Sequence, residues 1–453
     1  MLTLAFLFAA CGVEVAAPRP SATPAPASTG GTTATPRPTT ASNDVVYLRS
    51  IGGADLASIV AVDARTGTTL RALRDGAVSL DRSTIYWTES VSGGTQTIVH
   101  TTDLLTGRDL RTATLDGDLR PAPSGGFGPA ATDGKRLALK NVPYQLDGAW
   151  QTKLAFLDLA SGHIDMFDLS GTSTYDFIAF TRDGGAVVLN QYGEGTTKMR
   201  LLDLRSRALA DPGGTGSVGS SQNGFRTPPI LSADGRWMFL FDTGSLVTNC
   251  TSTDGPACVP NGVAPYVLAL DLVSRRIATI GLPTEQRSSD FEKYLLWSVA
   301  LTPDGSTLYV ANPALGVIDE IDARALSLRR TGHITVSRAD EGVLSAIGRV
   351  LFPVADAKRY LTSGALLSPD GRTLYAVAHD GLAVVDTTTL TSRGVWEPKH
   401  QFDVLGLSSD GARLYAIDNL NSRLVIFSAR DGLNLGELRL GSYAPAIVRI
   451  EAP

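Results

Sequence analysis

The 453-residue sequence predicts an all-β protein built from repeats. Short runs of alternating and β-branched residues are separated by clusters of turn residues, and the 46 glycines and 24 prolines supply those turns. A Ser-Pro-Asp-Gly turn followed by two strand-like runs recurs along the chain. Repeats of about 40–50 residues with this content are typical of propeller blades. The predicted fold class is therefore a single β-propeller of four-stranded blades.

The clearest copy of the repeat begins at Leu367 and ends at Leu390. Its turn leads into an alternating run, Thr373 to Ala378, and then into Leu382 to Val385, a strand that ends at an aspartate. Related turns recur around Asp81, Asp133, Asp183, Asp234, Asp304, Asp370 and Asp410. Their spacing is uneven, which favours a propeller, whose blades tolerate long loop insertions, over a solenoid with a tighter period.

The first repeat, from Val45 to Leu73, has three strand-like runs and lacks the innermost one. An apolar run near the C-terminus, Pro445 to Ile450, can supply it. Such a closure leaves no exposed sheet edge in the ring. Counting this unit with the seven that carry turns favours eight blades, and seven remain possible if one unit is irregular.

The chain opens with a short apolar run that ends in small residues and Cys11, a pattern typical of an export signal. The stretch Leu7-Phe8-Ala9-Ala10-Cys11 resembles the lipobox of bacterial lipoproteins, which implies that Cys11 is acylated and becomes the mature N-terminus. The alternative is a plain export signal with an incidental cysteine. Residues 1–11 are thus predicted to be the signal segment.

Residues 12–43 are rich in proline, threonine, alanine and serine, and they hold too little apolar bulk to fold. We expect a disordered tether that connects a lipid anchor to a propeller at residues 44–453, on the bacterial cell membrane or cell surface. Outside the cytoplasm, Cys250 and Cys258 are predicted to form a loop-closing disulfide; two free thiols are the alternative. A zinc site is not expected there, because no histidine lies nearby in the sequence.

The tetrapeptide Tyr309-Val310-Ala311-Asn312 comes within one residue of the YVTN motif. Together with the Ser-Pro-Asp-Gly turns, it resembles the YVTN-type and WD40-like repeats of the TolB type. The resemblance covers nearly all of residues 44–453 and implies a scaffold on which many functions are built.

The composition excludes one class of partner. Charged residues make up 19% of the chain, the net charge is −5 and the pI is near 5.6, and no stretch is strongly basic. Phosphate backbones are bound by clustered lysines and arginines, so we do not expect nucleic acid binding.

No catalytic motif stands out. The aspartates recur in every repeat, which indicates a structural role within turns, whereas a catalytic residue should be unique. His379 and His400 lie in loops expected on one face of the ring and could approach a shared site, but neither has a metal-ligating or catalytic partner at a recognisable spacing. We therefore predict no catalytic residue, no metal and no cofactor.

The long connections are where a binding surface would form. One of them, residues 141–151, carries Tyr144 and Trp150, which we name with His379 and His400 as candidate binding residues. The predicted function is that of a monomeric, surface-anchored binding or scaffolding module for a protein, peptide or glycan. The alternative is a propeller enzyme of the lactonase or lyase kind with a metal at the central channel.

Overall fold

The computed structural model of the chain describes residues 43–52, 56–122, 133–193, 196–214, 227, 229–244, 264–287, 293, 296–335, 364–398 and 400–451. Backbone contacts divide the chain into Met1–Thr39 and Thr40–Pro453, and the fold below is that of the second unit. Cys11, Cys250 and Cys258 lie outside the described residues, so acylation and the disulfide stay predictions. In the described residues, no helix is both long and apolar enough to span a bilayer.

The turn around Asp370 shows how one repeat folds. The Ser368 hydroxyl donates to Asp370 Oδ1 at 2.6 Å, and the same oxygen accepts the backbone N–H of Arg372 at 3.0 Å. Gly371 adopts a φ of 70°, which a residue with a Cβ disfavours. The Thr373 N–H then donates to the Ser368 hydroxyl at 2.9 Å. These bonds reverse the chain, so the following strand pairs antiparallel with the preceding one.

Antiparallel sheets of this kind make up the described chain. The first has the order β3-β2-β1-β34 and contains β1 (Val45–Gly52), β2 (Leu56–Asp63), β3 (Thr69–Arg74) and β34 (Tyr443–Glu451). The second contains β4 (Ala77–Val78), β5 (Thr84–Val91), β6 (Gln96–Asp103) and β7 (Asp109–Asp116). The third contains β8 (Arg120–Pro121), β9 (Arg136–Lys140), β10 (Tyr144–Leu146), β11 (Ala149–Asp158) and β12 (Ile164–Gly171).

The next two sheets follow in chain order. One contains β13 (Thr174–Phe180), β14 (Ala186–Gly193), β15 (Thr196–Asp203) and β16 (Leu209–Ala210). The other contains β17 (Gly213–Gly214), β18 (Ile230–Leu231), β19 (Trp237–Asp242), β20 (Tyr266–Asp271) and β21 (Arg276–Gly281), with β17 added parallel to β21.

An eight-stranded sheet consists of two four-stranded halves that meet in one parallel bridge between β25 and β29. Its first half contains β22 (Ser298–Leu301), β23 (Thr307–Asn312), β24 (Val317–Asp322) and β25 (Ser327–His333). Its second half contains β26 (Ala365–Leu367), β27 (Thr373–Val377), β28 (Leu382–Asp386) and β29 (Thr391–Trp396). The last sheet contains β30 (Val404–Leu407), β31 (Arg413–Asp418), β32 (Arg423–Ser428) and β33 (Asn434–Arg439). Two 3₁₀ turns, η1 (Ser92–Gly94) and η2 (Thr284–Gln286), interrupt the strand pattern.

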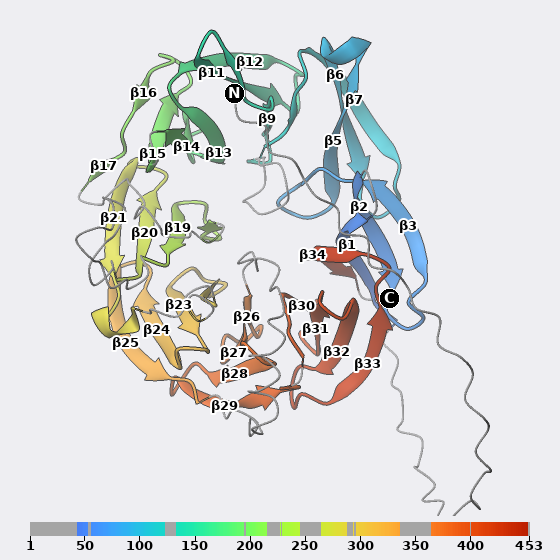
Figure 1. Ribbon diagram of the computed structural model, residues 1–453, viewed down its shortest axis with the longest axis vertical. Helices are drawn as coiled ribbons and strands as arrows, with labels where there is room; N and C mark the ends of the chain where they lie inside the picture. The colour runs from blue at the N-terminus through green and yellow to red at the C-terminus, as the bar shows by residue number, and fades with distance from the viewer. Residues whose placement is uncertain are drawn as a thin grey trace, which may run out of the picture. The chain divides into compact units, whose positions relative to one another are not determined.

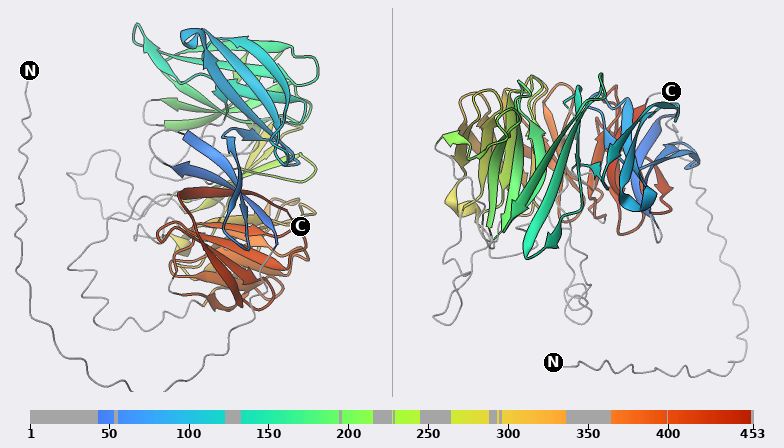
Figure 2. Two further views of the ribbon diagram at one scale, coloured as in Figure 1. Left: turned by 90° about the vertical axis from the view of Figure 1, so that its right-hand side faces the viewer. Right: turned by 90° about the horizontal axis from the view of Figure 1, so that it is seen from above.

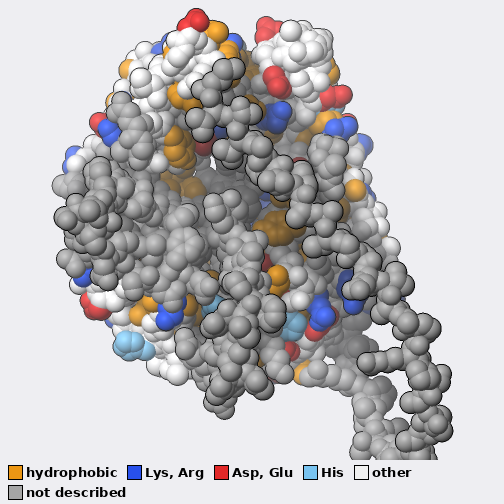
Figure 3. Space-filling view, in the orientation of Figure 1, with side chains coloured by type: hydrophobic (Ala, Val, Ile, Leu, Met, Phe, Trp, Pro, Cys, Tyr) orange, Lys and Arg blue, Asp and Glu red, His pale blue; other side chains and the backbone are white. Residues whose placement is uncertain are grey.

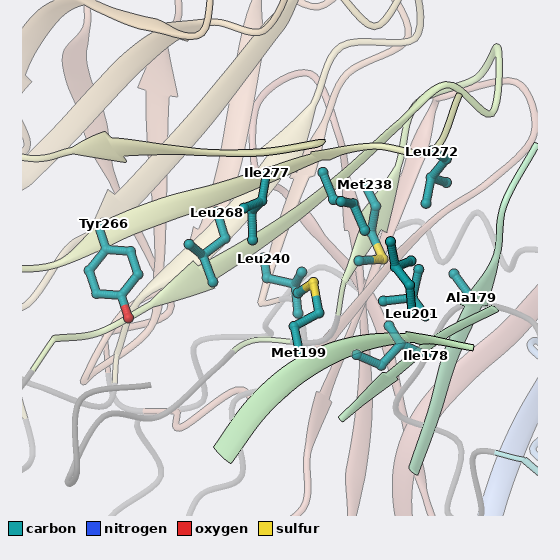
Figure 4. Packing of buried hydrophobic residues seen from close by; sticks show 12 residues of the cluster. Ile178, Ala179, Met199, Leu201, Met238, Leu240, Tyr266, Leu268, Leu272 and Ile277 are labelled. Carbon is teal, nitrogen blue, oxygen red and sulfur yellow. The ribbon is translucent and has the colours of Figure 1, made fainter. Parts of the chain in front are cut away.

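Buried apolar residues fill the space between successive sheets. In Figure 4, Met199 of β15 lies against Met238 and Leu240 of β19, so this cluster joins the β13–β16 sheet to the β17–β21 sheet. Equivalent clusters join every other consecutive pair, and the last joins the β30–β33 sheet back to the first sheet. The sheets therefore form a closed ring (Figure 1), which confirms the predicted all-β propeller.

The ring closes through the C-terminal strand. β34 pairs antiparallel with β1, with Val46 opposite Ile450, and so supplies the inner strand that the first repeat lacks. At the same junction Asp44, which is fully buried, accepts hydrogen bonds from Arg413 Nε at 2.7 Å and Nη2 at 2.8 Å, and from the Tyr415 hydroxyl. The predicted closure by a C-terminal strand is confirmed.

Candidate functional site

The strands of each sheet are connected at its two ends, and these ends form the two faces of the ring. One face carries the Asp-Gly turns between first and second strands and the short turns that follow the strand-ending aspartates; we call it the turn face. The opposite face carries the connections between second and third strands and those between sheets; we call it the loop face. In Figure 2 (right), the strands run between these two faces.

On the turn face, the repeated aspartates are bound within their own turns. Hydrogen bonds from the Thr302 and Ser306 side chains lower the pKa of Asp304 to about 2. The strand-ending Asp203 accepts the backbone N–H of Ser206 at 2.8 Å, and this bond, together with others, lowers its pKa to about 2. These contacts are local and repeat from sheet to sheet, so they give the aspartates the structural role that the sequence indicated.

On the loop face, the loops that hold His379 and His400 meet. The Gly381 N–H donates to the His400 carbonyl oxygen at 2.6 Å, which links the β27–β28 connection to the segment before β30. His379 Nδ1 lies 3.1 Å from Asp380 Oδ2. The structure therefore brings together the two loops that the sequence analysis expected to share a face.

His400 is held by a buried carboxylate. Its Nδ1 lies 3.0 Å from Oδ2 of Asp418, whose side chain is fully buried at the end of β31. Asn421 donates to both oxygens of Asp418, from its backbone N–H at 3.0 Å and from its side-chain amide at 2.8 Å. The imidazole also stacks on Phe402 at a centroid distance of 5.7 Å. Asp418 thus fixes the orientation of the His400 ring, a contact that the sequence spacing did not reveal.

Tyr144 and Trp150 lie on a separate hairpin, formed by β10 and β11. Tyr144 is opposite Gln151 and is 47% exposed, whereas Trp150 is only partly exposed. This hairpin belongs to the third sheet, and the core clusters show that this sheet does not adjoin the β26–β29 half or the β30–β33 sheet. The structure does not bring the aromatic pair and the two histidines together, and a binding role for the four stays a prediction.

A pocket of about 340 Å³ opens on the turn face, a volume in the range of small-molecule sites. It is formed by residues from four consecutive sheets, and no sequence motif marked it. Its lining consists of Leu80, Asp133, Lys135, Arg136, Asp158, Ala179, Phe180, Thr181, Arg182, Asp183, Gly184, Leu231, Gly235 and Leu272.

The sequence analysis also missed a buried pair on the loop-face side of β24. Asp319, with no exposed surface, accepts hydrogen bonds from Gln286 Nε2 at 3.0 Å and from the Thr331 hydroxyl at 2.6 Å. Within the described part of the chain, Asp319 Oδ2 and Gln286 Oε1 have no hydrogen-bond partner. Burial raises the pKa of Asp319, although these two hydrogen bonds act to lower it. The signal was in the sequence, because the position three residues before the strand-ending aspartate is usually apolar in the other repeats.

Among the described residues, no group of three or more His, Cys, Asp and Glu side chains is arranged to hold a metal ion. On the face shown in Figure 3, described acidic and basic side chains are interspersed around the rim rather than gathered by sign.

No protein-family model matches this chain, nor does any curated protein. Solved structures with a similar course of the chain include the periplasmic gluconolactonase PpgL of Pseudomonas aeruginosa, at 15% identity and a TM-score of 0.44, covering 91% of this chain and 99% of that one. The dihydro-heme d1 dehydrogenase NirN matches at 13% identity and 0.48, covering 88% and 74%. BamB of Moraxella catarrhalis matches at 15% identity and 0.41, covering 78% and 88%. At these values no activity, partner or location is transferred to this chain.

Proposed function

We propose that the protein is an exported, lipid-anchored, eight-bladed propeller that works as a binding or scaffolding module for a protein, peptide or glycan partner. The signal-like segment that ends at Cys11 and the proline-rich tether support export and anchoring. The two four-stranded halves of the eight-stranded sheet support the blade number. The loop and turn faces of such a ring are rigidly supported surfaces, as a scaffold requires.

One observation carries the proposal of binding rather than catalysis: the chemistry of the turn-face pocket. The carboxylates that line it are engaged as hydrogen-bond acceptors in their own turns. The backbone N–H of Ser161 is the main cause that lowers the pKa of Asp158, and the pKa of Asp183 is lowered despite its partial burial. A general base works best with a pKa near neutrality, so these two groups are suited to holding charge rather than to transferring protons.

A second function, an enzyme of the lactonase or lyase kind, is favoured by one observation on the loop face. Asp418 orients His400 through Nδ1, which is the arrangement in which a buried carboxylate prepares an imidazole for proton transfer at Nε2. The His400 side chain is 17% exposed, so solvent can reach its imidazole on the loop face. The metal-dependent form of this alternative needs further ligands beyond this pair.

The test compares binding with turnover in the same preparation. We expect the protein to bind members of a peptide or glycan array saturably while glucono-δ-lactone is hydrolysed no faster than in buffer. A matched pair of variants, His400→Gln and the exposed His163→Gln, decides the alternative. Lactone hydrolysis by the unaltered protein that His400→Gln abolishes and His163→Gln preserves would establish the enzyme and overturn the binding proposal.

A further inference from the structure

We propose that the turn-face pocket binds the carboxylate of a ligand that has a small apolar body, either a free organic acid or the acidic residue of a peptide. This inference rests on the proposed binding function and names the ligand chemistry of one site. It is argued from the charges that line the pocket, from the contacts that those charges already make, and from the apolar residues beside them.

The three acidic side chains of the lining are occupied. Asp133 accepts the backbone N–H of Lys135 at 2.9 Å and of Arg136 at 2.7 Å. Asp158 accepts the N–H of Ser161 at 2.7 Å. Their lone pairs point into their own turns, so these carboxylates have fewer acceptor positions free for a ligand.

Asp183 is the most heavily engaged of the three. It accepts the Thr181 hydroxyl at 2.6 Å and the Gly185 N–H at 2.9 Å. Its second oxygen accepts Arg275 Nη2 at 3.0 Å, so a guanidinium from the neighbouring sheet neutralises it. The pocket therefore holds this acid as part of its wall.

The basic side chains are used differently. Arg136 is fixed, because it donates to Asp133 Oδ2 at 2.7 Å and to the Gly184 carbonyl at 2.7 Å, and its guanidinium lies 4.4 Å from the centroid of the Phe180 ring. Lys135 and Arg182 are exposed, and in the described residues neither the Lys135 ammonium nor the Arg182 guanidinium makes a hydrogen bond or an ion pair. The Arg182 charge helps to lower the pKa of Asp234, but among the described residues neither cation makes a hydrogen bond that an incoming anion would have to break.

The remaining lining is apolar. Phe180 and Leu272 are buried beneath the pocket, and Leu80, 56% exposed, stands beside it. An isolated inorganic anion would leave the Leu80 side chain in contact with water. A carboxylate joined to an aromatic or aliphatic group would pair with the cations and also cover Leu80.

The test uses two matched probe pairs and calorimetric titration at low salt. Benzoate and neutral benzamide test the free acid; N-acetyl-Phe-Glu-amide and its Gln counterpart test the peptide source. We expect at least one of the two anions to bind about tenfold or more tightly than its neutral counterpart. Lys135→Gln and Arg182→Gln should each weaken that binding about five- to tenfold, whereas Arg65→Gln, an exposed arginine of the β2–β3 turn outside the lining, should leave it unchanged. Circular dichroism checks that the variants are folded.

Several outcomes overturn the inference: equal affinity for charged and neutral probes, no binding of either anion at millimolar concentration, or an equal loss in the Arg65→Gln variant, which would indicate attraction by the whole surface. The proposed function fails by a different result, namely lactone hydrolysis that depends on His400. If both the anionic probes and the array ligands bind the Lys135→Gln, Arg182→Gln double variant as they bind the unaltered protein, the carboxylate site is wrong and the binding module stands.

Discussion

The carboxylates of the turn face and those of the loop face are set in opposite environments. On the turn face, Asp203, Asp304 and Asp386 are near the surface and have pKa values lowered to about 2. Hydrogen bonds from their own turns are the main cause at Asp203 and Asp304, and a hydrogen bond from the Arg393 guanidinium is the main cause at Asp386. On the loop-face side, Asp319 is buried with two neutral donors and, among the described residues, no paired cation, and burial raises its pKa. One sheet can therefore stabilise the charge of one aspartate and penalise that of another, because the donors outweigh desolvation at Asp304 and desolvation outweighs the donors at Asp319.

This difference separates the aspartates that recur in every repeat from those that do not. A turn aspartate stabilises the reversal of the chain, which every sheet requires, so it recurs. In the described residues, Asp319 accepts no such turn N–H, and Asp418 adds a contact with His400 to the N–H that it accepts from Asn421. Residues that occur once on a repeated scaffold are where site-specific properties are expected.

The largest effect is expected when the cation is removed from Asp44, a fully buried acid of the turn face. We expect Arg413→Met to lower the free energy of unfolding by about 3 kcal/mol, because breaking a buried ion pair leaves a carboxylate without its counter-charge. The control is Arg423→Met, which removes an exposed pair with Glu437 and should cost less than about 1 kcal/mol. Chemical denaturation measures both. Equal losses in the two variants would show that Asp44 tolerates burial without Arg413.

A smaller effect, of opposite sign, is expected at Asp319. Its raised folded-state pKa means that its contribution to stability is fully present below the unfolded-state pKa and is lost as pH rises through the folded value. Asp319→Asn keeps the acceptor for Gln286 and Thr331 and removes the ionisable group. The variant should therefore be more stable than the unaltered protein by about 1–2 kcal/mol at pH 7.

The measurement is denaturation at a series of pH values from 3 to 8. The gain should grow with pH and vanish at the acidic end, where Asp319 is protonated in both the folded and unfolded states. Asp168→Asn, at an exposed position, serves as the control and should show no such dependence. A variant that is less stable than the unaltered protein at pH 7 would mean that Asp319 is ionised and needed as an anion.

The sequence predicted the repeats because their determinants are local. A Ser-x-Asp-Gly turn, an alternating strand and a strand-ending aspartate lie within about 20 residues of one another, and the missing inner strand of the first repeat pointed to the C-terminal run that β34 now occupies. Trp297 and Phe402, which lie just before inner strands, are buried. These features needed no knowledge of how one sheet meets another.

The sites could not be predicted in the same way because they join residues distant in the chain. The pocket brings Lys135 and Arg182 together only through the packing of neighbouring sheets. The His400–Asp418 contact depends on how the segment before β30 lies across the end of β31. Asp319 was visible as an acid at a position that is usually apolar in the other repeats. Its partner Gln286 comes from the preceding connection, whose course no sequence pattern predicted.

The smallest effect is expected at Asp304, a solvent-exposed aspartate of the turn face. Asp304 is almost fully solvated, so its hydrogen bonds contribute less than buried ones, and Asp304→Ala should lower the free energy of unfolding by about 0.5–1 kcal/mol at pH 7. Because its folded-state pKa is depressed to about 2, the contribution is present above the unfolded-state pKa near ~3.9 and is lost as pH falls toward about 2. As pH falls through that interval, Asp304→Ala should therefore gain stability relative to the unaltered protein, whereas Asp319→Asn should lose its advantage. Parallel denaturation series for the two variants test this, and slopes of the same sign would show that the two faces do not differ in how they hold charge.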